Sequence, residues 1–244
     1  MKGALPVLAS RFTVVVMPAY QAEQTLRRTV DELPRDQVDH LLLVDDASRD
    51  GTVAVALALG LDVRTHPRNR GYGANQKTCY REAIHLGATA VVLLHPDCQY
   101  DPAAVPNLLE PINDGRADIT FGSRFADGAD PRTGGMPYYR YLGNRFTTWV
   151  QNHLLGTHFT EMHSGMRAYT RAALERLNFT EFSDDFVFDT QMLVRAHALG
   201  LRIIEVPIPT RYSSDSSSIS IPRSLRYVGQ SIWECWCYRA SAHG

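Results

Sequence analysis

Short apolar runs alternate with amphipathic stretches along the first half of the chain. The clearest run is 91–94, where four apolar residues in a row are typical of a strand buried on both faces of a parallel sheet. We expect further strands at 12–17, 41–44, 62–65 and 118–121, and helices at 22–33, 53–59, 74–86 and 103–112. This alternation predicts βαβ units with right-handed crossovers, and therefore an α/β fold whose sheet is mostly parallel.

The second half combines longer helical stretches with isolated strand signals. Residues 126–137 are rich in Gly, Pro and Asp, which predicts a mobile lid or an acceptor-side loop at the hinge between two halves. Beyond it we expect helices at 138–155, 171–177, 186–199 and 222–238, strands at 164–169 and 201–206, and a flexible serine-rich segment at 213–220. The pattern predicts one domain over 1–244, with halves at about 12–121 and 122–212 and a C-terminal tail or helix at 213–244.

Composition limits the kinds of partner and the cellular compartment that we expect for the chain. The 25 Lys and Arg residues against 26 Asp and Glu give a formal charge of −1, so no global field favours nucleic acid or an anionic membrane, and any anion must be bound by local groups. The four cysteines lack the spacing of a zinc site, and a chain of this size needs no disulfides, which fits a reducing cytoplasm. No run approaches the roughly 18 apolar residues of a membrane span, so we expect a soluble or at most peripheral protein.

Polar side chains follow the apolar run at 91–94 directly. His95, Asp97 and Gln99 stand at two-residue spacing just beyond the expected strand. Open α/β sheets bind their ligands at the carboxyl ends of the strands, so these groups are candidates for a metal or phosphate site. A second interpretation is a polar loop in which Asp97 caps the next helix and Gln99 is solvated.

Two other strand ends carry similar signals. The run at 41–44 is followed by Asp45 and Asp46, and the third expected strand leads into a cationic, glycine-punctuated loop at 67–73. Glycines allow a backbone to approach a ligand closely. An alternative for the two acids is helix capping together with Ser48.

Seven short motifs follow one another along the chain. They are Val-Val-Met-Pro-Ala-Tyr at 15–20, Val-Asp-Asp-Ala-Ser-Arg-Asp-Gly-Thr at 44–52, Asn-Arg-Gly-Tyr-Gly-Ala at 69–74, the stretch around Asp97, Gly-Ser-Arg at 122–124, Ser-Gly-Met-Arg at 164–167 and Glu-Val-Pro-Ile at 205–208. In this order they resemble the motifs of the family-two, GT-A-fold glycosyltransferases, nearest the dolichyl- or polyprenyl-phosphate sugar transferases. The resemblance covers about 13–211. It implies a GT-A fold, in which a Rossmann-like, mostly parallel mixed sheet is flanked by helices.

The resemblance implies a donor site for a UDP- or GDP-sugar in the first half. Asp46 would accept a hydrogen bond from the base, which suits a carboxylate facing an imide or guanine N–H edge. The further residues expected to bind the nucleotide sugar are Pro18, Ala19, Tyr20, Gly73, Asn75, His95 and Asp97.

The metal motif departs from the family pattern. That pattern usually reads Asp-x-Asp-x-Gln, and His95 stands here in place of the first acid. Asp97 and Gln99 remain at the positions that imply Mg²⁺ or Mn²⁺, which would hold the diphosphate as it leaves. Manganese accepts imidazole more readily than magnesium does, so His95 is a candidate ligand. The alternative is a loop histidine bonded to the backbone.

Arginines of the second half are candidates for an acceptor phosphate, because guanidinium groups match phosphate oxygens. The expected phosphate-binding residues are Arg124, Arg140, Arg145, Ser164, Arg167 and Arg211. For Arg140 and Arg145 a solvated surface charge is the alternative.

Asp184, Asp185 and Asp189 are candidates for a catalytic base, and Asp97 and Arg124 are the other expected catalytic groups. Four-residue spacing on a helix would place Asp185 and Asp189 on one face, where repulsion raises one pKa. Helix capping by Ser183 or Asp184 is the alternative interpretation of this stretch.

The first hypothesis for function is the inverting transfer of a hexose from a UDP- or GDP-sugar to a polyprenyl phosphate. The alternatives are a soluble glycosyltransferase acting on a hydroxyl of a small metabolite or glycan, and a nucleotide-sugar-binding protein that has lost catalysis. Trp233, Trp236 and Tyr238 suit either a membrane interface or packing in a core or dimer. The sugar, the choice between UDP and GDP, and the oligomeric state stay open.

Overall fold

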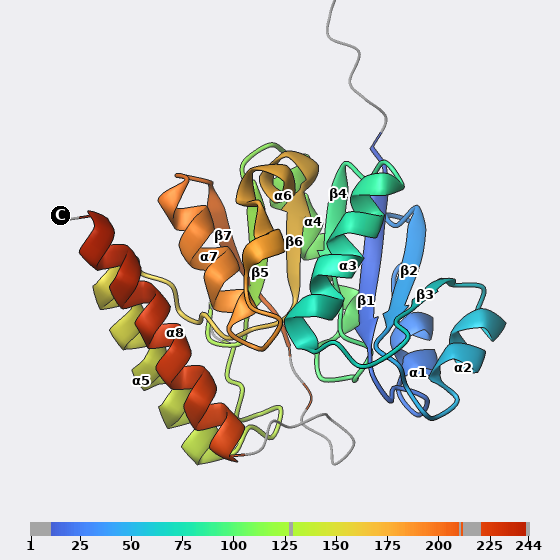
Figure 1. Cartoon of the computed structure of the whole chain (residues 1–244), viewed down its shortest axis with the longest axis horizontal. Helices are drawn as coiled ribbons and strands as arrows, with labels where there is room; N and C mark the ends of the chain where they lie inside the picture. The colour runs from blue at the N-terminus through green and yellow to red at the C-terminus, as the bar shows by residue number, and fades with distance from the viewer. Residues whose placement is uncertain (1–10, 127–128, 210, 212–220, 243–244) are drawn as a thin grey trace, which may run out of the picture.

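A computed structural model describes residues 11–126, 129–209, 211 and 221–242 (Figure 1). The strands are β1 (Thr13–Ala19), β2 (His40–Asp45), β3 (Asp62–Thr65), β4 (Ala90–Leu93), β5 (Ile119–Ser123), β6 (Arg167–Thr170) and β7 (Ile203–Pro207). The α-helices are α1 (Leu26–Asp31), α2 (Thr52–Ala58), α3 (Tyr72–His85), α4 (Val105–Asn113), α5 (Tyr138–Leu155), α6 (Arg171–Leu177), α7 (Phe188–Ala198) and α8 (Ile221–Ala242), with short 3₁₀ helices η1 (Pro102–Ala104) and η2 (Phe179–Glu181). The serine-rich segment predicted to be flexible lies outside the described residues.

The strands form one seven-stranded sheet in the order β3-β2-β1-β4-β6-β5-β7. Strand β1 pairs in parallel with both β2 and β4, β2 with β3, and β5 with β7, whereas β6 runs antiparallel to its two neighbours. The expected α/β fold with a mostly parallel mixed sheet is therefore confirmed. The chain leaves β1 for β2 on one side and later returns to its other side as β4, which makes the carboxyl ends of β1 and β4 a ligand-binding position.

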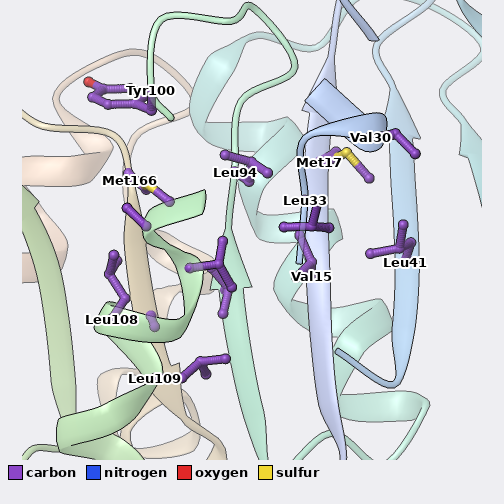
Figure 2. Packing of buried hydrophobic residues seen from close by; sticks show 14 of the residues in the cluster. Val15, Met17, Val30, Leu33, Leu41, Leu94, Tyr100, Leu108, Leu109 and Met166 are labelled. Atoms are coloured by element: carbon purple, nitrogen blue, oxygen red, sulfur yellow. The ribbon is translucent and has the colours of Figure 1, made fainter. Parts of the chain in front are cut away.

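Helices cover both faces of this sheet, which explains the continuous apolar runs. Every residue of β1 and β4 is buried. Val15 and Met17 pack with α1, α2 and α4 on one face, and Val14 and Val16 pack with α3, α6 and α7 on the other. Figure 2 shows the first of these clusters, where Leu108 lies among side chains of the sheet. Side chains alternate along a strand, so a strand covered on both faces needs apolar residues throughout.

Several boundaries differ from the sequence-based expectation where a tertiary contact decides them. The predicted helix 22–33 is helical only over α1, because the backbone N–H of Ala22 donates to Thr52 Oγ1 in a turn. The predicted strand 164–169 begins only at β6, since Gly165 N donates to the hydroxyl of Tyr100 instead of joining the ladder. Helix α8 is longer than predicted at both ends.

The two longest helices lie side by side at one end of the molecule, and α2 lies at the opposite end (Figure 1). These helices are α5 and α8, and α8 also contacts α7. The C-terminal ends of α5 and α8 lie next to each other, because Arg239 Nη1 near the end of α8 donates to the carbonyl of His153 near the end of α5. None of the helices in the described ranges combines the length and hydropathy that a transmembrane span requires.

The core assignment predicts unequal costs for two leucine substitutions. Leu108 is fully buried on α4, whereas Leu57 on α2 is 60% exposed. Leu108→Ala should lower the free energy of unfolding by about 2–5 kcal/mol, because it leaves a cavity in a closely packed core. Leu57→Ala, the matched control, should change it by less than about 0.5 kcal/mol. Urea denaturation measures both, and equal effects would contradict the assignment.

Candidate active site

A cavity of about 1000 Å³ lies at the carboxyl ends of β1, β2 and β4. Its first wall is made by Pro18, Ala19 and Tyr20 at the end of β1, and Asp46 follows β2. Further wall residues are Asn69, Gly71, Tyr72 and Asn75 just before and at the start of α3, His95 and Asp97 after β4, Asp185 and Phe186 before α7, and Arg223, Arg226, Tyr227 and Gln230 on α8. The cavity thus brings together most of the residues predicted to bind the donor and adds a wall from α8.

Asp46 fixes the loop that enters α3. Its Oδ1 accepts a hydrogen bond from Arg70 N at 2.9 Å and its Oδ2 accepts one from Gly71 N at 3.0 Å, while His66 Nδ1 lies 2.7 Å from Oδ1. Asp46 is buried and does not cap a helix with Ser48; Asp45 accepts from Ser48 N instead. A carboxylate has about four lone-pair sites, so Asp46 retains capacity to accept from a ligand.

Asn75 and Gly73, which were predicted to bind the donor, both make structural contacts within the fold. Asn75 Nδ2 donates to the carbonyls of Ala19 and Val44, which joins the ends of β1 and β2, and its Oδ1 is buried without a hydrogen bond. A Cβ on Gly73 would lie 2.4 Å from the carbonyl oxygen of Ser183. Gly73 is therefore required for the close approach of the segment before α7, and it is not among the residues that line the cavity.

The segment after β4 places one carboxylate at the cavity. Asp97 is half-buried in the cavity wall, and its Oδ1 accepts a hydrogen bond from Gln99 N at 3.0 Å. Gln99 is not in the wall; its carbonyl accepts from Arg211 N. Of the three predicted metal ligands, the structure brings His95 and Asp97 to the cavity together.

His95 is held by Tyr72. The two rings stack with centroids 5.4 Å apart, and His95 Nε2 lies 3.1 Å from the hydroxyl oxygen of Tyr72. That hydroxyl has one hydrogen, which it donates to Asp189 Oδ2 at 2.8 Å, so His95 Nε2 must be the protonated nitrogen that donates to Tyr72. A Cβ on Gly165 would lie 2.9 Å from this nitrogen, so only glycine leaves room for the ring.

The pKa values of His95 and Tyr72 agree with a neutral imidazole that donates to a protonated phenol. Burial, more than any charge, lowers the pKa of His95 below its ordinary value, although Asp97 and Asp189 act in the opposite direction. Burial, followed by the charge of Asp189, raises the pKa of Tyr72 well above its ordinary value. The imidazole is therefore neutral and the phenol protonated at neutral pH.

The predicted base residues occupy different places. Asp185 is exposed and lines the cavity. Asp189 is buried behind Tyr72, where its Oδ1 also accepts from Gln76 Nε2. The expectation that Asp185 and Asp189 lie on one helix face is wrong, because α7 begins at Phe188 and Asp185 lies before it. Asp184 forms an ion pair with Lys77, and the alternative interpretation, a cap by Ser183 or Asp184, is not observed, because the N-cap residue of α7 is Val187.

The predicted phosphate-binding residues lie outside the cavity wall. Arg124 is buried against Glu161, with 2.8 Å between Arg124 Nε and Glu161 Oε1. Arg167 is fully buried and donates to the carbonyls of Ser164 and Asp189, which places Ser164 in the interior as well. Arg211 forms ion pairs with Glu32 and Asp101 on the surface, and Arg140 and Arg145 lie on α5 beside aromatic rings.

Two arginines that the sequence did not single out are in the wall. Arg223 and Arg226 on α8 line the cavity together with Tyr227 and Gln230. Tyr227 fixes this end of α8, because its hydroxyl lies 2.8 Å from His163 Nδ1. The helical pattern at 222–238 predicted the helix, but no local signal indicated that its first turns face the ends of β1 and β4.

The residues at the end of β4 fit a divalent cation held mainly by its substrate. No group of three or more His, Cys, Asp or Glu residues in the described ranges has the geometry of a metal site. Magnesium commonly binds through one or two carboxylates, water and substrate phosphates, which matches Asp97, the one carboxylate that the segment after β4 contributes to the wall. Because His95 Nε2 carries a proton, that nitrogen has no lone pair with which to bind a metal. Metal binding by His95 therefore stays a prediction.

Comparison with known proteins identifies the family. A family model described as glycosyl transferase family 2 matches residues 14–177, more than half of the chain. The chain belongs to glycosyl transferase family 2. This family-2 chain is therefore a glycosyltransferase, which confirms the enzyme class predicted from its motifs.

Relatives of this family-2 glycosyltransferase include enzymes named for lipid-phosphate acceptors. It is 31% identical over 205 residues to polyprenol monophosphomannose synthase of Mycolicibacterium smegmatis, covering 80% of this chain and 76% of that protein. It is 26% identical over 226 residues to UDP-N-acetylglucosamine–dolichyl-phosphate N-acetylglucosaminyltransferase of Methanococcus voltae, covering 86% and 89%. These matches confirm the resemblance to polyprenyl-phosphate sugar transferases.

A solved structure supports the fold. Glucosyl-3-phosphoglycerate synthase of Mycobacterium tuberculosis, in complex with Mn²⁺, UDP-glucose and glycerol 3-phosphate, gives a TM-score of 0.72. It is 21% identical, and the match covers 95% of this family-2 chain and 81% of that one. The expected GT-A fold is confirmed.

The buried Arg124–Glu161 pair predicts a large cost for removing one partner. Burial favours a higher pKa for Glu161, but the charge and hydrogen bonds of Arg124 outweigh it and hold the pKa below the ordinary value. Glu161→Gln should lower the free energy of unfolding by about 3–5 kcal/mol, because Arg124 stays buried without its counter-charge. In the exposed Arg116–Glu110 pair, Glu110→Gln should cost at most about 1 kcal/mol.

The same pair sets a pH dependence. A carboxyl whose folded-state pKa is depressed contributes stability above its unfolded pKa and loses it as the pH falls through the folded value. The difference in free energy of unfolding between the wild type and Glu161→Gln should therefore have its largest value at neutral pH and decrease in acid. A difference that is constant from neutral pH into strong acid would contradict the pairing.

Proposed function

We propose that this glycosyltransferase transfers a hexose from a UDP- or GDP-sugar to a polyprenyl phosphate with inversion of configuration. One observation carries the proposal: a single cavity has the donor motifs on one wall, Asp97 beside them, and two arginines of α8 in the same lining. Relatives named for polyprenol or dolichyl phosphate support the acceptor class.

The wall formed by β1 and β2 suits a nucleotide. Pro18 and Ala19 offer an apolar floor, and the ring of Tyr20 is 51% exposed although it is large and apolar. An exposed aromatic ring beside a cavity provides a surface for a planar base. Asp46, rigidly held at the end of β2, would accept from the N–H edge that both uracil and guanine present.

Asp97, with diphosphate oxygens and water, would hold a divalent cation such as Mg²⁺ or Mn²⁺. A cation bound there supplies neutralisation of the charge that grows on the leaving diphosphate. His95 takes a positioning role in this proposal, because its ring packs between Tyr72 and Gly165 beside Asp97. Its neutral state adds no negative charge to the cation site.

The α8 wall suits an acceptor that carries a phosphate. Arg223 and Arg226 have exposed side chains that line the cavity, and guanidinium groups bind phosphate oxygens with matched geometry. A phosphate oxygen is already anionic, so its attack on the anomeric carbon requires no strong base. Asp185 in the same wall is available as a base if the acceptor is a hydroxyl.

Asp97→Ala tests the donor side. Transfer should fall at least about hundredfold, because removing a group that stabilises transition-state charge costs about that much or more. The increase in UDP or GDP affinity caused by Mn²⁺, measured by isothermal titration calorimetry, should disappear as well. Asp114→Ala, an exposed acid after α4, is the control. Unchanged turnover in purified Asp97→Ala would refute the proposal.

Arg223→Ala/Arg226→Ala tests the acceptor side. The KM for a polyprenyl phosphate should rise at least about tenfold, since each lost charge-assisted hydrogen bond contributes about 1.5–3 kcal/mol. The KM for the nucleotide sugar should change little. Arg27→Ala on the exposed side of α1 is the matched control.

A radiolabelled donor identifies the acceptor class in the same assay. Lipid-linked product partitions into the organic phase, and product on a small metabolite or glycan stays in the aqueous phase. If labelled product is found only in the aqueous phase, the lipid-phosphate acceptor is rejected and a hydroxyl acceptor takes its place in the proposal. Nucleotide binding without transfer to any acceptor would indicate a chain that has lost catalysis.

A further inference from the structure

Helix α5 has its polar side buried and its apolar side exposed. All its buried residues except Leu155 are polar, namely Thr147, Thr148 and Gln151. Exposed large side chains recur at positions three or four apart and form what we call the α5 stripe, which is Tyr138, Leu142, Phe146 and Trp149. Such spacing places them on one helix face. A helix that packs only against its own protein normally shows the opposite arrangement.

Helix α8 repeats this inversion. Its fully buried positions are Ser231 and Cys235. Leu225, Trp233 and Trp236, the α8 stripe, stand eight and three residues apart and therefore share a helix face. The side chains of both stripes are between 49% and 69% exposed. The two neighbouring helices thus both turn their apolar faces to the outside.

This exposure is concentrated at one end of the molecule. Among the described residues, the large apolar side chains exposed elsewhere are Tyr20, at the cavity, and Leu57 on α2. All three tryptophans of the chain, Trp149, Trp233 and Trp236, belong to the two stripes. Exposed apolar side chains gathered on two neighbouring helices indicate an interaction surface, and tryptophan and tyrosine are enriched where proteins meet a membrane–water interface.

The charge of the two helices indicates what covers them. Helix α5 contains no acidic residue, and the single acid of α8 is Glu234, whose Oε1 accepts from Gln191 Nε2 of α7. The pair carries five arginines, which are Arg140, Arg145, Arg223, Arg226 and Arg239. The whole chain has a formal charge of −1, so positive charge is segregated into the region that also carries the apolar stripes.

We propose that the α5 and α8 stripes dock on the surface of an anionic lipid bilayer. Aromatic and aliphatic side chains would enter the headgroup region while arginines pair with anionic lipids, which is the recognised pattern of interfacial helices. A second copy of the chain is a poorer partner, because an isologous contact would bring two arginine-rich surfaces together. The inference does not depend on the identity of the acceptor.

Helix α8 links this surface to the cavity. The same helix carries the α8 stripe on its exposed face and directs Arg223 and Arg226 into the cavity wall. If the acceptor is a lipid phosphate, as proposed above, docking would bring its headgroup to the arginines without extracting the lipid chain from the bilayer. This consequence rests on the proposed function, whereas the docking itself does not.

Tryptophan fluorescence tests the docking without a label, because all three reporters lie in the stripes. The protein is mixed with vesicles of phosphatidylcholine alone or of phosphatidylcholine with phosphatidylglycerol, in the absence of donor and acceptor. We expect a blue shift and co-sedimentation with the anionic vesicles, both weakened by salt. Trp149→Ala/Trp236→Ala keeps Trp233 as reporter and should weaken partitioning at least about tenfold.

Leu57→Ala is the matched control, since it removes an exposed leucine at the opposite end of the molecule (Figure 1) and should leave partitioning unchanged. Nucleotide binding, measured by calorimetry, should be equal in the wild type and in both variants. Absence of co-sedimentation with anionic vesicles would overturn the proposal. So would a blue-shifted emission in free protein, which indicates that other residues cover the stripes, or a dimer that the double variant abolishes.

Discussion

The hydroxyl group of Tyr72 connects three parts of the fold at the edge of the cavity. It lies at the start of α3, donates to Asp189 on α7, and accepts from His95 after β4. Because Asp189 also accepts from Gln76 and its carbonyl accepts from Arg167, the segment after β4 is connected to both helices through a hydrogen-bonded group centred on this oxygen. The segment that presents Asp97 therefore starts from a rigid base, which is what a site for a highly charged substrate requires.

The arginines inside the protein and those at the cavity have different partners. Interior arginines are held by the protein: Arg124 pairs with Glu161, and Arg167 donates from Nε and Nη1 to backbone carbonyls, while its Nη2 is buried without a hydrogen-bond partner among the described residues. These buried contacts hold the second half of the chain to the sheet. The arginines in the cavity wall, Arg223 and Arg226, come from α8 and not from the sheet.

The strands and the donor wall were predictable because their signals are local. The run at 91–94 and the turn residues after it are adjacent in sequence, and parallel strands necessarily bring their carboxyl ends together. The acceptor side was not predictable in the same way. Whether Arg124 reaches a ligand depends on Glu161, and whether Arg211 does depends on Glu32 and Asp101, partners that no spacing rule relates to them. The placement of α8 over the cavity is equally a product of long-range packing against α5 and α7.

The contacts of His95 link the residue type at position 95 to its surroundings. An aspartate at position 95 would lose the stacking on Tyr72 and leave the space beside Gly165 unfilled, while placing a second negative charge next to Asp97. An acid at position 95 therefore requires compensating changes at neighbouring positions, and engineering one alone produces a less stable protein.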